Sequence, residues 1–329
     1  MRYCFFLFLS FCFSGLHAQT LQLLDTTKKS SLRGLSVVNN TTVWLSGSNG
    51  TVGLSTDAGK TFSWITVDGY KKTDFRDIEA FDAETAIIMG IDTPAVILKT
   101  TNGGKTWKKV FEDKRPGMFL DALEFWNEMS GIVVGDPIDG KLFIARTFDG
   151  GETWRGLPQK NYPIVEKGEA MFASSGTNVT KLNKQEAVIV TGGKKSNIFI
   201  RDAKINLPII QGEDFTGANS VAVYKNKIIV VGGDFSKDTL RKNNCVLTLD
   251  KGNTFIAPAT PPFGYRSCVV FLSKNKLIAC GTSGVDVSED GGINWRNISK
   301  ESFHVVQKAK KGTSVFLAGG KGRVAMLVW

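Results

Sequence analysis

Two short stretches of the sequence contain the tripeptide G-K-T, which ends the phosphate-binding loop of many nucleotide-binding proteins. They lie at residues 59–61 and 104–106. A phosphate-binding loop also needs a glycine five residues before the tripeptide, so that the backbone amides can curl around the phosphate. Leu54 and Lys99 occupy those two positions. Both matches therefore fail, and the sequence predicts no nucleotide site here.

Histidine chemistry depends on one residue, because His17 lies in a predicted leader and only His304 remains. A zinc site built from several histidines is thereby excluded, and a Ser-His-Asp triad would need His304 itself. The stretch 281–284 has the wrong spacing for a G-x-S-x-G nucleophile turn, and G-x-G-x-x-G is absent. We expect no catalytic residue, no metal and no cofactor. His304 is interpreted as a residue that forms hydrogen bonds.

Polar residues recur at the start of seven short apolar runs along the chain. Equivalent positions of these runs hold Arg33, Arg76, Asp121, Glu169, Asn219, Arg266 and His304, and Asp77 and Ser267 follow two of them directly. Arginine binds carboxylates and phosphates through two parallel hydrogen bonds. The set could therefore hold an anionic ligand or a peptide. Alternatively, the three arginines pair with Asp77, Asp121 and Glu169 and only neutralise a narrow interior.

Both G-K-T stretches belong to an octet that recurs along the chain. Its copies are STDAGKTF (55–62), TTNGGKTW (100–107), TFDGGETW (147–154), TLDKGNTF (248–255) and SEDGGINW (288–295). The third position holds Asp57, Asn102, Asp149, Asp250 and Asp290. Such side chains accept hydrogen bonds from the backbone amides of their own turn, and the following glycine permits a positive φ. The octets are therefore predicted to be hairpin tips, with the closing aromatic packed beneath.

The octets alternate with apolar strands that end in glycine. There are seven of these strands, and their glycines are residues 47, 90, 135, 192, 232, 281 and 319. A further apolar strand precedes each one, in the fourth unit at 169–175, and no amphipathic helical stretch competes with this pattern. Spacings of 38 to 57 residues are typical of propeller blades with four short strands. The sequence therefore predicts an all-β, seven-bladed β-propeller.

The last unit supplies three strands before the chain ends. We expect the N-terminal stretch LQLLD to be the fourth, so that both chain ends close one blade and no sheet edge is left open. Residues 19–329 would then form a single domain, which we expect to be a monomer. The inner strands of a propeller line its channel, so the polar residues described above would form a ring at one mouth.

Residues 1–18 have the features of a secretory signal: one early positive charge, a short apolar run and Ala18 at its end. No later run is long enough to cross a bilayer, and we expect a secreted or periplasmic protein. The chain has 41 Lys and Arg against 31 Asp and Glu. This balance favours anionic partners, although scattered lysines are equally typical of a soluble surface. Export argues against nucleic acid as a partner.

Three cysteines follow the leader: Cys245, Cys268 and Cys280. Their number is odd, and their spacing matches no metal site. Cys268 and Cys280 flank a predicted hairpin and could lie close together. Free buried thiols are the favoured state, and the sequence leaves a disulfide between these two open.

The octets match the Asp-box, or bacterial neuraminidase repeat, a motif specific for a blade turn. The units at 31–62 and 87–107 resemble the photosystem II stability/assembly factor family, which includes non-photosynthetic bacterial relatives often labelled "oxidoreductase". The resemblance implies a seven-bladed, exported propeller that acts as an assembly or scaffold protein. In photosynthetic members the partner is a photosystem II reaction-centre subunit.

We therefore expect a non-enzymatic exported protein that binds another protein, a membrane-protein subunit being one candidate. A purely structural envelope protein is one alternative. A sialidase-like glycoside hydrolase is the other, because sialidases hold a carboxylate with three arginines and use a tyrosine, for which Tyr265 is available. Sialidases, however, have six blades and an F-R-I-P-like stretch. Residues 75–78 read F-R-D-I and lack the proline.

Overall fold

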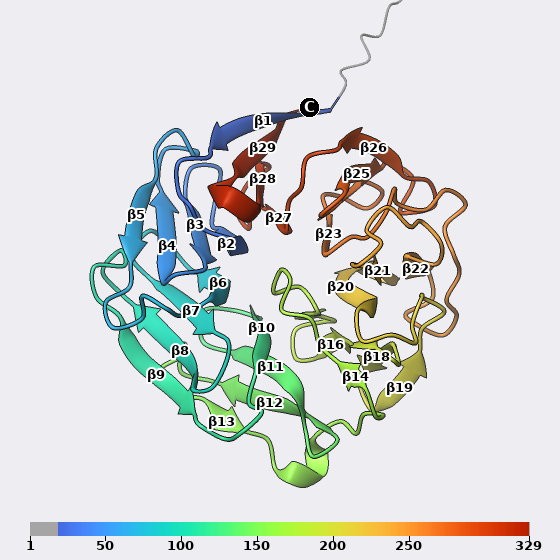
Figure 1. The fold of residues 1–329 in the computed structure, drawn as a ribbon, viewed down its shortest axis with the longest axis horizontal. Helices are drawn as coiled ribbons and strands as arrows, with labels where there is room; N and C mark the ends of the chain where they lie inside the picture. The colour runs from blue at the N-terminus through green and yellow to red at the C-terminus, as the bar shows by residue number, and fades with distance from the viewer. Residues whose placement is uncertain (1–18, 329) are drawn as a thin grey trace, which may run out of the picture.

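The structure is a computed structural model that describes residues 19–328, so the predicted signal at 1–18 lies outside the described residues. The strands form seven antiparallel sheets around one axis (Figure 1). Within the described residues, helix is limited to two 3-10 turns, η1 (Gln159–Asn161) and η2 (Gly320–Gly322). The prediction of an all-β, seven-bladed propeller is confirmed.

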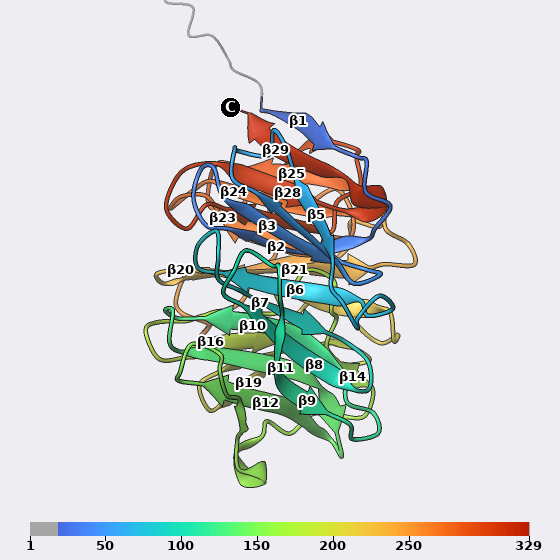
Figure 2. The ribbon, with the colours of Figure 1, turned by 90° about the vertical axis from the view of Figure 1, so that its left-hand side faces the viewer.

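Blades 1 to 3 each have four strands, in chain order from the channel outward. Blade 1 contains β2 (Leu32–Val37), β3 (Val43–Gly47), β4 (Thr51–Ser55) and β5 (Ser63–Thr66). Blade 2 contains β6 (Phe75–Ala80), β7 (Ala86–Gly90), β8 (Ala95–Thr100) and β9 (Lys108–Asp113). Blade 3 contains β10 (Leu120–Phe125), β11 (Gly131–Ile138), β12 (Lys141–Thr147) and β13 (Arg155–Gly156). Figure 2 shows the ring from its side, with the outer strands β5 and β9 toward the viewer.

Blades 4 and 5 are less regular. Blade 4 contains β15 (Val179–Lys181), β16 (Ala187–Val190), β18 (Asn197–Ile200) and β19 (Ala203–Asn206). Blade 5 contains β20 (Thr216–Tyr224), β21 (Lys227–Asp234) and β22 (Cys245–Thr248), and its sheet is extended by β17 (Gly192–Gly193) and β14 (Glu169–Ala170). In blade 4 a two-residue turn at 201–202 replaces the octet.

The inner strand predicted at 169–175 is wrong for blade 4. Only Glu169 and Ala170 of this stretch are in a strand, and the innermost strand of blade 4 is β15. Small and polar residues fill positions 173–177, and Gly176 has a φ of 68°, which interrupts an extended strand. In Figure 1 the segment that follows β14 reaches toward the centre of the ring.

The ring is closed by both ends of the described chain. Blade 6 contains β23 (Cys268–Phe271), β24 (Leu277–Gly281), β25 (Gly284–Ser288) and β26 (Arg296–Ser299). Blade 7 contains β27 (Val305–Lys308), β28 (Val315–Ala318), β29 (Val324–Val328) and, outermost, β1 (Thr20–Asp25). Thr20 pairs with Val328 in an antiparallel register (Figure 1). The predicted closure by the N-terminal strand is confirmed.

The five octets form tight turns at the tips of the blades. In each turn the side chain of the third residue accepts a hydrogen bond from the backbone amide four residues later, over 2.9–3.0 Å; these residues are Asp57, Asn102, Asp149, Asp250 and Asp290. The first hydroxyl also accepts from the glycine amide, as at Ser55 and Gly59, 2.9 Å apart. Hydrogen bonds from Thr61 lower the pKa of Asp57 to about 2.

Buried side chains of adjacent blades form the core. Trp44 of blade 1 is fully buried and meets the octet residue Trp107 of blade 2 edge to face, with ring centroids 6.5 Å apart. Such burial stabilises by roughly 1.5–3 kcal/mol per large side chain. Cys245, Cys268 and Cys280 are buried free thiols, although Cys268 lies directly opposite Cys280. Over residues 19–328, no helix has the length and apolar character needed to span a membrane.

Candidate functional site

The inner strands share an irregularity that decides which side chains reach the channel mouth. The pairing register shifts across Arg33 in β2, Arg76 in β6, Asp121 in β10 and Asn219 in β20. Ser267 and His304 hold the same place in blades 6 and 7, because their amides donate to the carbonyl groups of Cys280 and Ala318, the partners of the next residues. Such a β-bulge re-aims the side chain of the extra residue.

A cavity of about 360 Å³ lies at the mouth where the inner strands begin. Of the residues predicted to form the ring, the structure brings Arg33, Arg76, His304 and Ser267 to its wall. We call this cavity the mouth pocket. Its remaining lining residues include Phe119, Asp136, Phe172, Ser174, Phe235 and Tyr265. Of these six, sequence reasoning considered only Tyr265 for a site.

The two arginines of the mouth pocket differ in their partners. Arg76 Nε pairs with Asp74 over 2.8 Å, and its Nη1 donates to the Ala173 carbonyl over 3.5 Å. Arg33 forms no ion pair within residues 19–328, and its Nη1 donates to the neutral Ser174 carbonyl over 3.3 Å. Burial, followed by the nearby Arg76 cation, lowers the pKa of Arg33.

His304 is the third basic residue of the mouth pocket. Its Nε2 lies 3.4 Å from Ser31 Oγ. Burial, followed by the charges of Arg33 and Arg76, lowers the pKa of His304 to about 3. The imidazole is therefore neutral at pH 7 and available for hydrogen bonding.

Residues 171–178 cross the channel beneath the mouth pocket, and we call this segment the channel strap. Besides the two arginine contacts at Ala173 and Ser174, the Ser175 hydroxyl donates to the Ser267 carbonyl over 2.7 Å. Thr177 Oγ1 donates to Ser220 Oγ over 2.7 Å. The channel strap is thus bound to blades 1, 2, 5 and 6. A separate cavity of about 330 Å³ lies on its other side, lined by Asp77, Glu79, Glu124, Lys181 and Lys310 among others.

Asp77 does not line the mouth pocket. Its carboxylate accepts hydrogen bonds from the amides of Ile78 and Leu123, each over 2.8 Å. Burial raises the pKa of Asp77 well above its usual range. The structure thus places Asp77 between blades 2 and 3, where it links their inner strands.

Asp121 is fully buried and also lies outside the wall of the mouth pocket. Within the described residues, neither carboxylate oxygen forms a well-aligned hydrogen bond, although the amides of Asp136 and Ala173 lie near enough to favour its ionised form. Burial, followed by the charge of Asp136, raises the pKa of Asp121 well above its usual range, while Arg76 opposes that shift.

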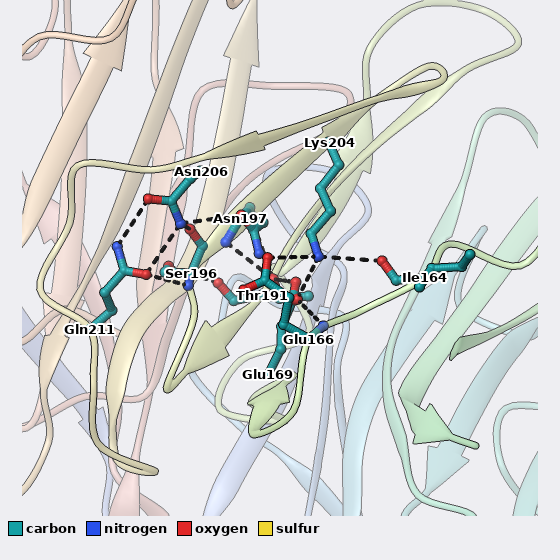
Figure 3. Close-up of polar contacts among 9 residues, drawn as sticks. All are labelled: Ile164, Glu166, Glu169, Thr191, Ser196, Asn197, Lys204, Asn206 and Gln211. Carbon is teal, nitrogen blue, oxygen red and sulfur yellow. Dashed lines mark hydrogen bonds and ion pairs between the residues drawn. The ribbon is translucent and has the colours of Figure 1, made fainter. Parts of the chain in front are cut away.

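Glu169 takes part in a different polar network, which Figure 3 shows. Its side chain is fully buried and pairs with Lys204 Nζ over 2.9 Å. Thr191 Oγ1 and the Glu166 amide also donate to it, over 2.5 and 2.9 Å. This network ties β14 to blade 4, and Glu169 is paired with a lysine, not with one of the three arginines that the alternative interpretation of the sequence proposed.

Arg266 does not reach the mouth pocket, which corrects its assignment to the ring. It is fully buried, and its Nε and Nη2 both contact Asp286 Oδ2 over 2.7 Å. The physical reason is the bulge: in blade 6 it falls on Ser267, one residue later than the sequence alignment assumed. The three arginines considered for a sialidase-like site are therefore not together. Tyr265 does line the pocket, but its hydroxyl donates to Asn219 over 2.7 Å.

Residues 19–328 contain no group of three or more His, Cys, Asp or Glu side chains placed to hold a metal ion. The mouth pocket offers both charged and aromatic groups to a ligand. Two guanidinium groups, a neutral imidazole and an aromatic wall meet in one concave site.

Comparison with known proteins agrees with this fold. Residues 16–123 match the family described as photosynthesis system II assembly factor YCF48. No curated protein matches the sequence. Among solved structures, YCF48 bound to D1 peptide has a TM-score of 0.66 at 18% identity, over 96% of this chain and 98% of that one.

Two further structures show how widely this architecture occurs. YCF48 from Cyanidioschyzon merolae gives a TM-score of 0.66 at 16% identity, over 93% of this chain and 98% of that one. The Pan2 WD40 domain of Neurospora crassa gives 0.62 at 12%, over 93% and 94%. At these identities the structural matches establish the fold. Together with the sequence match, they confirm the expected resemblance: this chain is similar to the photosystem II assembly factor YCF48 family and shares the propeller fold of the YCF48 structures.

Proposed function

We propose that this protein is an exported, non-enzymatic propeller that binds another protein as an assembly or scaffold factor. The proposal is supported by the sequence match to the YCF48 family over residues 16–123 and by the shared fold. One of these YCF48 structures holds a peptide of the D1 protein. By analogy, the partner of this chain is a segment of another polypeptide, and a subunit of a membrane complex fits an exported protein.

The observation that carries the proposal is the mouth pocket. Arg33, Arg76 and His304 come from blades 1, 2 and 7 and converge on one concave surface. Propeller mouths receive residues from several blades, so a ligand there is contacted from many sides. The proposed contact surface is smaller than the ring predicted from the sequence. Four members of that ring are buried and do not line the mouth pocket: Asp77, Asp121, Glu169 and Arg266.

Affinity capture from the native host, followed by mass spectrometry, tests the proposal. The wild-type chain should enrich a specific protein, and the double variant Arg33→Glu, Arg76→Glu should lose it. Lys60→Glu is a matched control: Lys60 is exposed in an octet turn, at the end of blade 1 opposite the mouth pocket. Equal capture by the wild type and the double variant, with both folded, would move the interface elsewhere.

A further inference from the structure

Arg33 is a buried cation that forms no ion pair within residues 19–328. The two carboxylates nearby have other partners: Asp74 pairs with Arg76 over 2.8 Å, and Asp136, on the wall of the mouth pocket, accepts a hydrogen bond from the Met171 amide over 2.8 Å. The guanidinium of Arg33 carries five N–H donors, yet its one acceptor among the described residues is the Ser174 carbonyl at 3.3 Å. Removing a cation from water without pairing it is costly. The mouth pocket is thus electrostatically suited to a single negative group beside Arg33.

An aromatic wall faces the same cavity. Phe172 and Phe235 meet edge to face with ring centroids 6.0 Å apart, and Phe235 and Tyr265 do so at 6.1 Å. Phe235 is 48% exposed, which is unusual for a phenylalanine held by aromatic neighbours on several sides. Covering this ring with an apolar side chain would be favourable, at roughly 25 cal/mol per Å² buried. The ligand therefore needs an apolar group close to its negative group.

The channel strap gives the mouth pocket a floor. Its contacts with Arg33, Arg76, Ser267 and Ser220 fix it across the channel, and the cavity on its far side is separate. A polypeptide cannot run through the channel past this segment. The end of a chain, in contrast, can enter a pocket that is open at the mouth and closed at its floor. It can place a carboxylate and a side chain of the same residue inside the pocket.

We propose that the mouth pocket binds the free C-terminal carboxylate of a polypeptide that ends in an aromatic residue. Arg33 receives the carboxylate, and the Phe172, Phe235 and Tyr265 rings receive the side chain. This inference rests on the proposed function and specifies the partner by its last residue. Arg76 contributes less, because Asp74 already occupies its guanidinium.

Titration calorimetry with short peptides tests the assignment. The probe is N-acetyl-Ala-Ala-Phe with a free carboxylate, compared with the same peptide as its C-terminal amide. We expect the amide to bind at least tenfold more weakly. Arg33→Gln should also weaken binding of the free acid at least tenfold, Arg76→Gln should weaken it less, and Lys60→Gln should leave it unchanged. Melting temperatures of the variants establish whether each is folded.

Several outcomes would overturn the inference. These are equal binding of the acid and the amide, absence of binding by both, or tighter binding of inorganic phosphate than of the free acid. If Arg33→Gln fails to fold, the comparison of acid with amide on the wild type still decides. Host capture that depends on the mouth arginines, combined with equal binding of acid and amide, would keep the proposed function and reject this inference. If host capture does not depend on the mouth arginines and the acid and amide bind equally, the proposed function at this pocket and this inference are both rejected.

Discussion

The Asp77 carboxylate of blade 2 accepts a hydrogen bond from the Leu123 amide of blade 3 over 2.8 Å. The same position, one residue after the bulge, is used again further around the ring. Ser220 Oγ accepts from the Val269 amide over 3.0 Å, and Cys268 Sγ accepts from the Val306 amide over 3.4 Å. In blades 2, 5 and 6 the residue after the bulge therefore joins neighbouring blades, while the bulge residues Arg76 and Ser267 line the mouth pocket.

Replacing Asp77 by alanine should destabilise the propeller. The buried Leu123 amide would lose its acceptor, which costs about 1–3 kcal/mol. Chemical denaturation measures the change. Asp77→Asn keeps one oxygen and should cost less, and Asp68→Ala, at an exposed position, should have almost no effect. Equal stabilities for Asp77→Ala and Asp68→Ala would show that this link between blades is not needed.

Gly176 should be intolerant of any side chain. A Cβ atom there would lie 2.3 Å from Cγ and both carboxylate oxygens of Asp77, and φ is +68°. Gly176→Ala must therefore displace the channel strap. The free energy lost in this displacement adds to the roughly 1 kcal/mol that a left-handed backbone costs an alanine. Gly69→Ala isolates the backbone term, because Gly69 has a φ of +78° and open space around it. We expect the loss of stability in Gly176→Ala to exceed that in Gly69→Ala by at least 1 kcal/mol.

The effect on the mouth pocket provides a second readout for the same pair of variants. A displaced channel strap removes the carbonyl contacts of Arg33 and Arg76. The affinity of the mouth pocket for the free-acid peptide should then change in Gly176→Ala and stay unchanged in Gly69→Ala. Identical stability and binding in the two variants would contradict the packing of Gly176 against Asp77.

Sequence reasoning identified the blades because their signals are local. A hydroxyl, an Asp or Asn and a glycine define each octet turn within eight residues, and the turns lie where the octets predicted them. Which side chains face the channel mouth cannot be read from a local pattern. It depends on where the bulge falls in each inner strand, and a shift of one residue turns a different side chain toward the channel. This is how Arg266 was assigned to the ring while Ser267 reaches it. The channel strap was unpredictable for another reason: its conformation depends on contacts with four other blades.

A sialoside hydrolysis assay addresses the enzymatic alternative. We expect no turnover of a fluorogenic sialoside, because Arg266 is held by Asp286 and cannot join Arg33 and Arg76 around a carboxylate. Burial also raises the pKa of Tyr265 to about 12, which makes its phenol a poor nucleophile. Turnover that disappears in Arg76→Ala would establish a hydrolase and overturn this expectation.

Asp121 should make the protein less stable as the pH rises. Its carboxyl is fully buried, and its pKa in the folded state lies well above its usual range because burial outweighs the nearby Arg76 charge and the amides of Asp136 and Ala173. The unfolded chain ionises this group near pH 3.9, so above that pH the unfolded state holds fewer protons at this site, and stability falls until the folded-state pKa is passed. Asp121→Asn removes this dependence and keeps the shape of the side chain. The variant should therefore melt at a higher temperature than the wild type at pH 7, and the two should differ much less at pH 3.5. A lower melting temperature for Asp121→Asn at pH 7 would mean that the ionised carboxylate, paired at a distance with Arg76, is a net source of stability.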